Sequence, residues 1–419
     1  MKREAADVVM VSRGDAKTRR ACLKGHGSSC ATLPTSRVSW QKMKLGELGT
    51  VVTGMTPPTK HQAYYGDNYL FVTPSDLDFD SYFISKTERC ISRQGYEKYY
   101  KRFIPAMSTM YTCIGSTIGK IGLSRETVLT NQQINSIIPN DAHDARFVYY
   151  LMRSLTNEIR ALNAGCAVPI INKGDFENID VPLVPLPLQR RIADILSAYD
   201  DLIENNRRRI AILEEAARCI FEAEIVNGNW DCVPVDALVE VNPEVPKPTC
   251  DGIRYIPMSA LSTSGMTVEL SDSEIRAQST SVRFLNGDVL LARITPCLEN
   301  GKTAYVNFLA DGEIGCGSSE FIVLRGRRVS SYFTYCLARL DAFRGIAIKS
   351  MIGASGRQRV QLSCFSDFQI QVPDDATLRH FDATVAPMFD QIGILSKQSA
   401  DLAAARDMLL PRLMKGEVA

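Results

Sequence analysis

Two long segments of the chain carry hydrophobic residues at helical spacing. Between residues 188 and 225 there is no proline or glycine, and apolar residues recur every three or four positions. This heptad pattern predicts a long helix with a single apolar stripe. We place the following residues on that stripe: Ile192, Tyr199, Leu202, Asn206, Leu213 and Ile220.

The pattern returns near the C-terminal end. Pro387 and Gly393 interrupt it, so we expect a kink or a local irregularity near them. Each segment has roughly 35–38 residues, or about 55 Å of helix. Because the lengths match, we predict that the two helices form a coiled coil; the alternative is that each packs only on its own domain. The predicted stripe of the second helix consists of Phe381, Met388, Leu395, Leu402 and Leu409.

The region before each long helix contains a repeat. Four segments recur in the same order: residues 69–77 match 254–261, 110–124 match 289–306, 146–155 match 331–340, and 173–185 match 362–374. The offset drifts from 184 (Phe71 to Tyr255) to 191 (Pro182 to Pro373), as loop insertions would produce in a duplicated domain.

Each copy has mixed secondary-structure signals. Short apolar runs bounded by turn residues, such as 70–72 and 135–138, predict strands, and residues 147–155 and 332–340 predict short helices. The predicted fold is α+β, with two tandem mixed α/β domains, each followed by a long helix. We expect a basic, disordered tail at 1–36, domains at 37–186 and 227–376, and long helices at 187–226 and 377–419.

Composition narrows the class of protein. No apolar run approaches the ~18 residues that span a bilayer, and the charged N-terminus does not resemble a secretory signal, so we expect a cytoplasmic location. The 12 cysteines include no CxxC pair, which argues against a zinc site. The net charge of +1 does not indicate nucleic acid, but residues 342–361 contain four basic residues and no acidic one. Such a patch can bind phosphates or be ordinary solvated surface.

Catalytic motifs are incomplete in this chain. Residues 300–303 (NGKT) resemble the end of a P-loop, but Pro296 stands where that motif needs glycine. Residues 242–245 (NPEV) resemble an adenine-methylation motif without its second proline and its aromatic residue. HExxH and GxSxG are absent, and the four histidines are dispersed. We therefore predict neither a catalytic residue nor a metal ligand.

Side chains of the types that can bind base edges are found in matching loops of the two copies. Arginine can bind guanine, and asparagine or glutamine can bind adenine. Each residue alone is more often ordinary loop surface, but the matched placement favours DNA contact for the set as a whole. The candidates are Thr56, Lys60, Tyr64, Tyr65, Ser116, Thr117, Lys120, Asn131, Gln132 and Lys173 in the first copy, and Arg293, Thr295, Ser318, Ser319, Arg357, Gln358 and Arg359 in the second.

Three segments resemble the specificity subunit of Type I restriction–modification systems. Residues 40–48 (WQKMKLGEL) resemble the start of its target recognition domain, and residues 409–419 (LLPRLMKGEVA) resemble its C-terminal end. Residues 185–217 resemble its central helix, with the pattern P-x-x-x-Q-x-x-I followed by heptads. Residues 372–385 lack the Gln-x-x-Ile of the first copy, and residues 1–36 have no counterpart in this resemblance.

The resemblance implies a non-catalytic DNA-binding subunit. Each domain would read half of a bipartite, asymmetric target in double-stranded DNA, and the antiparallel helices would set the spacer. Two methyltransferase (modification) subunits would dock on the helices and supply S-adenosylmethionine-dependent methylation, while restriction subunits would use ATP and magnesium; this chain would bind no cofactor and no membrane. The alternatives are a coiled-coil scaffold without DNA specificity and an enzyme of an unrecognised type.

Overall fold

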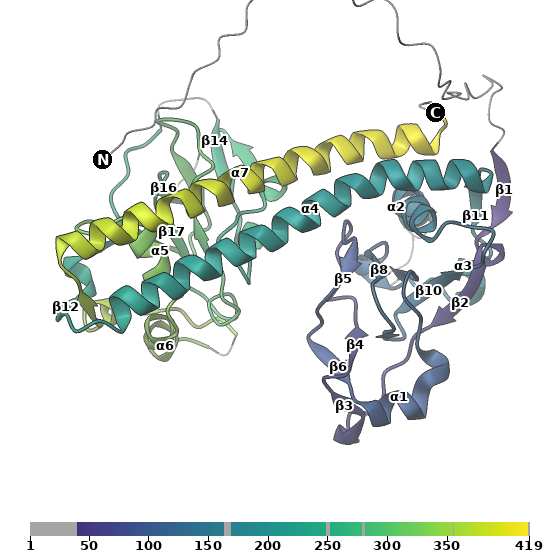
Figure 1. Cartoon of the computed structure of the whole chain (residues 1–419), viewed down its shortest axis with the longest axis horizontal. Helices are drawn as coiled ribbons and strands as arrows, with labels where there is room; N and C mark the ends of the chain where they lie inside the picture. Colours follow the sequence, from purple (N-terminus) through teal and green to yellow (C-terminus); the bar gives the residue numbers. More distant parts are fainter. Residues whose placement is uncertain (1–39, 163–168, 249–251, 279–280, 355, 418–419) are drawn as a thin grey trace, which may run out of the picture. The chain divides into compact units, whose positions relative to one another are not determined.

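The computed structural model describes residues 40–162, 169–248, 252–278, 281–354 and 356–417. The tail predicted at residues 1–36 lies outside the described residues. The described chain forms two copies of a mixed α/β domain and two long helices (Figure 1).

The first copy contains a two-stranded, a five-stranded and a four-stranded sheet, and its longest helix shares a hydrophobic core with the five-stranded sheet. Strands β1 (Gln41–Lys44) and β11 (Asp180–Leu183) pair antiparallel, so the two ends of the copy meet. The larger sheet has the order β2 (Gly49–Thr53), β10 (Ile134–Pro139), β7 (Thr109–Thr112), β8 (Ile121–Ser124) and β5 (Phe83–Ile84). The smaller has β3 (Tyr65–Gly66), β6 (Arg89–Ile91), β4 (Tyr69–Val72) and β9 (Leu129–Thr130). The helices are α1 (Arg93–Tyr99), α2 (Ala145–Leu162) and α3 (Lys173–Glu177).

The second copy has the same plan. Strands β12 (Asp231–Pro234) and β21 (Gln369–Val372) join its two ends. One sheet has the order β13 (Val239–Val241), β20 (Phe321–Gly326), β17 (Val289–Ala292) and β18 (Thr303–Tyr305). The other has β15 (Glu274–Arg276), β14 (Ile253–Ile256), β19 (Gly315–Gly317) and β16 (Val282–Phe284). The helices are α5 (Ser331–Arg339) and α6 (Asp341–Lys349).

Strand pairing confirms the repeat found in the sequence. In the first copy β7 lies between β10 and β8, and in the second β17 lies between β20 and β18. The parallel pair β4–β9 aligns Phe71 with Leu129, and the parallel pair β14–β19 aligns Tyr255 with Cys316. The helices predicted at 147–155 and 332–340 are found in α2 and α5.

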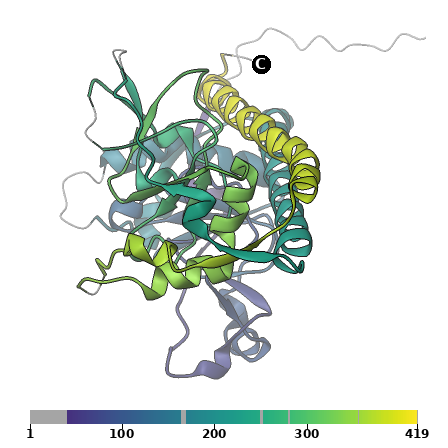
Figure 2. The same cartoon turned by 90° about the vertical axis from the view of Figure 1, so that its left-hand side faces the viewer.

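The two long helices pack against each other in antiparallel orientation. They are α4 (Leu186–Phe221), which continues as a π-helical turn over Glu222–Val226, and α7 (Asp375–Met414). Ile192 near the start of α4 shares a core with Leu413 near the end of α7, while Phe221 at the end of α4 packs on Phe381. Figure 1 and Figure 2 both show the helices side by side. Each end of the pair thus belongs to the hydrophobic core of one domain copy.

Burial along the helices agrees with the predicted stripe except at Leu202. Fully buried stripe residues are Ile192, Asn206, Phe381 and Leu395, and half-buried ones are Tyr199, Leu213, Ile220, Met388, Leu402 and Leu409. The prediction that Leu202 is a core residue is wrong: its side chain is 48% exposed, because Ile203, at 4%, takes the inward position.

Helix α7 continues through Pro387 and Gly393 as one helix, without the predicted irregularity breaking it. Proline removes one backbone donor from a helix. Val385 and Phe389, on either side of Pro387, are buried in the second core, and this packing favours the continuous helix.

Candidate functional site

Three segments of the second copy are joined by backbone hydrogen bonds into one surface, the second loop cluster. The N–H of Arg293 donates to the Glu320 carbonyl (2.8 Å), and the N–H of Thr295 donates to Gln358 (3.1 Å). The N–H of Val360 donates back to the Arg293 carbonyl (3.0 Å). The cluster comprises residues 293–297, 318–320 and 357–361. It therefore contains all the residues predicted to bind DNA in this copy: Arg293, Thr295, Ser318, Ser319, Arg357, Gln358 and Arg359.

An ion pair lies on the second loop cluster. Nε of Arg359 donates to both carboxylate oxygens of Glu320 at 3.0 Å, and Nη2 donates to Oε1 at 2.6 Å. The hydrogen bonds and the charge of Glu320 raise the pKa of Arg359. The backbone of Arg359 is fixed as well, because it bridges antiparallel to Ile294 and to Ile352.

The first copy has an equivalent surface, the first loop cluster. The N–H of Cys113 donates to Gln133 (2.8 Å), the N–H of Gly115 to Pro169 (2.8 Å), and the N–H of Ile171 to Cys113 (2.9 Å). These three bonds correspond one by one to those of the second loop cluster. The cluster comprises residues 113–117, 131–133 and 169–173. Five of the predicted DNA contacts lie on it: Ser116, Thr117, Asn131, Gln132 and Lys173.

The side chains of the first loop cluster are mostly uncharged. Thr56 donates through its hydroxyl to Gln132 Oε1 (2.6 Å), which joins the predicted contact Thr56 to the cluster. The amide of Asn131 donates to Gln133 Oε1 (3.4 Å). Gln133 occupies the position of Glu320, and Ile170, 62% exposed, occupies the position of Arg359. The two clusters share a backbone and differ in chemistry.

Two equivalent lysines stabilise the loops behind the clusters. The ammonium of Lys120 donates to the Pro74 carbonyl (3.2 Å), and that of Lys302 donates to Met258 (2.7 Å). Lys120 also lies 3.6 Å from the Asp78 carboxylate. The ammonium of Lys302, the lysine of the incomplete P-loop, is therefore hydrogen-bonded within its own domain. The same holds for Lys120, which was predicted to contact DNA.

The remaining predicted contacts of the first copy are next to the smaller sheet. The hydroxyl of Tyr65 donates to Pro57 (2.6 Å), and burial raises the pKa of Tyr65. Tyr64 packs edge-on against Tyr99, with 5.5 Å between ring centroids. Lys60 is exposed on the segment before them. Tyr64 and Tyr65 therefore contribute to the packing of the smaller sheet.

A buried tyrosine, carboxylate and arginine connect the first copy to both long helices. Tyr150 of α2 donates to Asp200 of α4 (2.5 Å), and Arg406 of α7 donates to the other carboxylate oxygen. Burial and the charge of Asp200 raise the pKa of Tyr150. Burial alone would lower the pKa of Arg406, but its bonds to Asp407 and Asp200 and their charges raise it. We call Tyr150 and Asp200 the first anchor.

The second copy repeats the device on the same helix. Tyr335 of α5, which the repeat aligns with Tyr150, donates to Glu214 of α4 (2.5 Å). The other oxygen of Glu214 accepts from the Met266 N–H (3.0 Å), and Arg339 lies 3.9 Å away. Burial and the charge of Glu214 raise the pKa of Tyr335. Tyr335 and Glu214 form the second anchor, so both copies are attached to α4 by a buried carboxylate.

Gln189 explains why the sequence pattern at the start of α4 needs an amide. Its Nε2 donates to the Val184 carbonyl (2.8 Å), and its Oε1 accepts from the Asp144 N–H (3.0 Å). His143 Nδ1 lies 3.3 Å from the amide nitrogen, and burial lowers the pKa of this histidine. Helix α7 starts differently: Asp374 caps it by accepting from the Thr377 N–H (2.8 Å).

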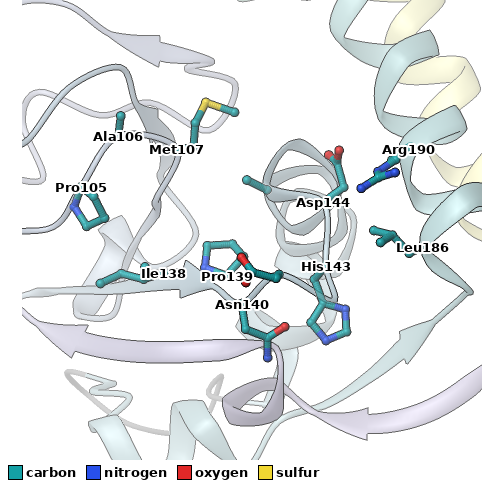
Figure 3. A pocket seen from close by; sticks show the side chains of 12 residues that line it. Pro105, Ala106, Met107, Ile138, Pro139, Asn140, His143, Asp144, Leu186 and Arg190 are labelled. Atoms are coloured by element: carbon teal, nitrogen blue, oxygen red, sulfur yellow. The ribbon is translucent and has the colours of Figure 1, made fainter.

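A pocket of about 540 Å³ lies beside this connection. Figure 3 shows side chains from residues 105–107, 138–145 and the start of α4 around it, including His143, Asp144 and Arg190. Among the described residues, no group of three or more His, Cys, Asp or Glu side chains is placed to hold a metal ion. The helices of the described part also include none long and apolar enough to cross a bilayer.

Several large apolar side chains of the helix pair are exposed. Ile195, Leu202 and Ile212 of α4 and Ile394 and Met408 of α7 all have this property. We call them the outer apolar residues. Burial of apolar surface favours association between proteins, so these five side chains, which lie on both long helices, are candidates for contact with a partner.

Comparison with known proteins finds one kind of relative. Residues 37–215, which include the first loop cluster and most of α4, match the model of the Type I restriction modification DNA specificity domain. Over nearly its whole length the chain is similar to type I restriction–modification specificity subunits. The specificity subunit of the MjaIX enzyme of Methanocaldococcus jannaschii is 25% identical over 90% of this chain and 93% of its own length. That of HindI from Haemophilus influenzae is 32% identical over 40% of this chain and 38% of its own length.

The fold of a solved specificity subunit is similar as well. The S subunit of M. genitalium superposes with a TM-score of 0.52 and 16% identity, covering 91% of this chain and 97% of the other. At that identity the likeness concerns the fold. It agrees with the duplicated domains and long helices described above.

Sequence reasoning missed the two anchors and the partner of Arg359. Tyr150 and Tyr335 occupy the same position of a repeat that the sequence already reveals, and this identity was a usable signal. Asp200 and Glu214 are acidic residues 14 positions apart, or two heptads, on one helix face. Glu320 gave no signal, because it lies 39 residues from Arg359.

Proposed function

We propose that each domain copy of this specificity subunit reads one half of a bipartite, asymmetric DNA target through its loop cluster. The observation that carries the proposal is the common backbone of the two clusters with different side chains on it. Loops with the same backbone present their side chains from the same positions, and different side chains select different bases. The first cluster offers amides, which suit adenine, and the second offers arginines, which suit guanine.

The helix pair sets the length of the unread spacer. Both anchors lie on α4, at Asp200 and Glu214, and the separation of 14 residues (214 − 200) corresponds to about 21 Å along a helix. A rigid helix therefore fixes the distance between the two attachment points. Because one turn of DNA is about 34 Å, a fixed domain separation selects a fixed number of base pairs. The buried pair of Arg406 and Asp200 also fixes the register of α7 on α4.

Two methyltransferase subunits dock on the helix pair. The outer apolar residues support this part of the proposal, since they leave large hydrophobic side chains uncovered among the described residues. The chain itself is non-catalytic. S-adenosylmethionine, ATP and magnesium bind to the methyltransferase and restriction subunits, which carry out the chemistry.

Binding and methylation experiments test the function. The chain is purified with its methyltransferase subunits, and the methylated adenines of DNA exposed to the complex are mapped. We expect one bipartite motif, and binding to it about 10³-fold or more tighter than to a duplex with both halves scrambled, with affinity falling steeply as salt rises. Equal affinity for every sequence at physiological salt would overturn the proposal. A complex that forms and stays intact without any DNA preference would instead indicate a scaffold.

A further inference from the structure

The ion pair on the second loop cluster leaves one edge of an arginine available. Arg359 binds Glu320 through Nε and Nη2, the side edge of the guanidinium. Within the described residues, the end edge formed by Nη1 and the outer hydrogen of Nη2 has no protein acceptor. The side chain is 45% exposed, so this edge is accessible from outside the domain.

An arginine fixed in this way matches one base. Two parallel N–H groups of a guanidinium fit the O6 and N7 atoms of guanine in the major groove. Glu320 restricts the rotation of the guanidinium, and the bridges to Ile294 and Ile352 fix the backbone, so little conformational entropy is lost on binding. We propose that Arg359, oriented by Glu320, recognises a guanine in the half of the target that the second copy reads. The inference rests on the proposed function and adds to it the base that is read, guanine, and the residue that reads it, Arg359.

The first copy lacks this device. At the equivalent positions it has Ile170 and Gln133, which cannot form an ion pair or donate a bidentate pair from the same place. The guanine contact therefore belongs to only one half of the target. An exposed isoleucine at this place can contact a thymine methyl group instead.

The experiment measures base preference at each position of the second half-site. Complexes of the full chain with its methyltransferase subunits carry Arg359→Ala, Arg359→Lys or Glu320→Gln, and their Kd values are compared on duplexes with all four base pairs at every position. We expect the wild-type complex to prefer guanine at one position by about 5- to 150-fold, the range for one bidentate contact. Arg359→Ala should abolish that preference, and Arg359→Lys should reduce it, because lysine keeps the charge but not the planar fork.

Glu320→Gln separates orientation from charge. It should reduce the guanine preference, because the amide fixes the arginine less well, while affinity for scrambled DNA stays equal or becomes tighter because a negative charge near the phosphates is removed. The first half-site should keep its preference in all three variants. The other positions of the second half-site should keep theirs as well, and this readout shows that the altered copy is folded.

Arg276 provides a matched control. It forms the same kind of side-edge pair, with Glu274 at 2.9 Å from Nε and 2.8 Å from Nη2, but lies at the other end of the sheet from residue 318. Arg276→Ala should leave the guanine preference unchanged. An unchanged preference in Arg359→Ala or in Arg359→Lys, or an equal loss in Arg276→Ala, would overturn the inference. In that case a wild-type complex that still selects a bipartite motif would leave the proposed function standing.

Discussion

The two domain copies have the same backbone and use different chemistry on it. The bonds Cys113 to Gln133 and Arg293 to Glu320 are both 2.8 Å long, although the residues differ in size and charge. Backbone hydrogen bonds do not depend on side-chain identity, so the loops keep their positions while their side chains change. The backbone of the clusters is thus independent of the side chains that it carries. We therefore expect substitutions on the clusters to alter base preference without altering the fold.

The connections of the copies to the long helices show a second contrast. The carboxylate of the first anchor binds a cation of the opposite helix, since Arg406 of α7 donates to Asp200. The carboxylate of the second anchor has a cation of its own domain nearby, because Arg339 belongs to α5. The buried charges therefore tie the first copy to both helices, whereas the second copy contacts α7 through apolar packing, with Phe389 against Tyr305 and Tyr335.

Removal of the interhelical cation should have the largest effect. In Arg406→Ala the carboxylate of Asp200, 3% exposed, stays buried without its arginine. Loss of one partner of a buried ion pair costs about 3–5 kcal/mol of the free energy of unfolding. Equilibrium unfolding in urea measures it. Arg412→Ala, which removes an exposed arginine of the same helix, should change stability by less than about 0.5 kcal/mol, and equal values for the two variants would contradict the prediction.

Two leucines of α4 should separate folding from docking. Leu213 is half-buried against the second core, so Leu213→Asp should cost about 3 kcal/mol by placing a charge there. Leu202 is exposed, so Leu202→Asp should leave stability within about 0.5 kcal/mol and weaken binding of the methyltransferase subunits. Asn205→Asp adds the same charge as a control. Urea unfolding and calorimetric titration check the pair; unfolding of Leu202→Asp like Leu213→Asp would refute our view of the helix faces.

The anchors should control the spacer with a smaller effect on stability. Tyr150→Phe and Tyr335→Phe each leave a buried carboxylate without one hydrogen bond, which costs about 1.5–3 kcal/mol. In each variant the domain copy is held less firmly in its orientation on α4. Each variant should therefore also methylate targets whose spacer differs by one base pair from that of the wild type. Tyr199→Phe, on α4 outside both anchors, should keep the single spacer length. Strict retention of that length by both anchor variants would exclude the anchors as spacing determinants.

Much of the architecture could be predicted because its signals are periodic. The heptads of α4 and α7 and the four repeated segments are local patterns, and local patterns determine helix positions and the order of strands. The same patterns were less reliable at single residues. Leu202 and its neighbour Ile203 are both apolar, and only packing against α7 and the domain decides which of them turns inward.

The candidate DNA-binding surface could be predicted in part from the sequence. The sequence predicted seven candidate DNA contacts on separate segments of the second copy, and the structure brings these segments together. Their contact with DNA stays a prediction. The role of Lys120 could not be foreseen, since its acceptor is the Pro74 carbonyl, 46 residues away. Neither could the anchors, whose tyrosines and carboxylates come from different elements.

The sequence by itself determined that this protein has two copies of one domain, two long helices and no recognisable catalytic motif. These properties depend on neighbouring residues and on self-similarity, which need no three-dimensional information. The tertiary structure alone decided that Glu320 orients Arg359. It also decided that Asp200 and Glu214 of α4 accept hydrogen bonds from the two domain copies. The physical reason is that hydrogen bonds and ion pairs act over about 3 Å, and folding brings such atoms together from distant parts of the chain.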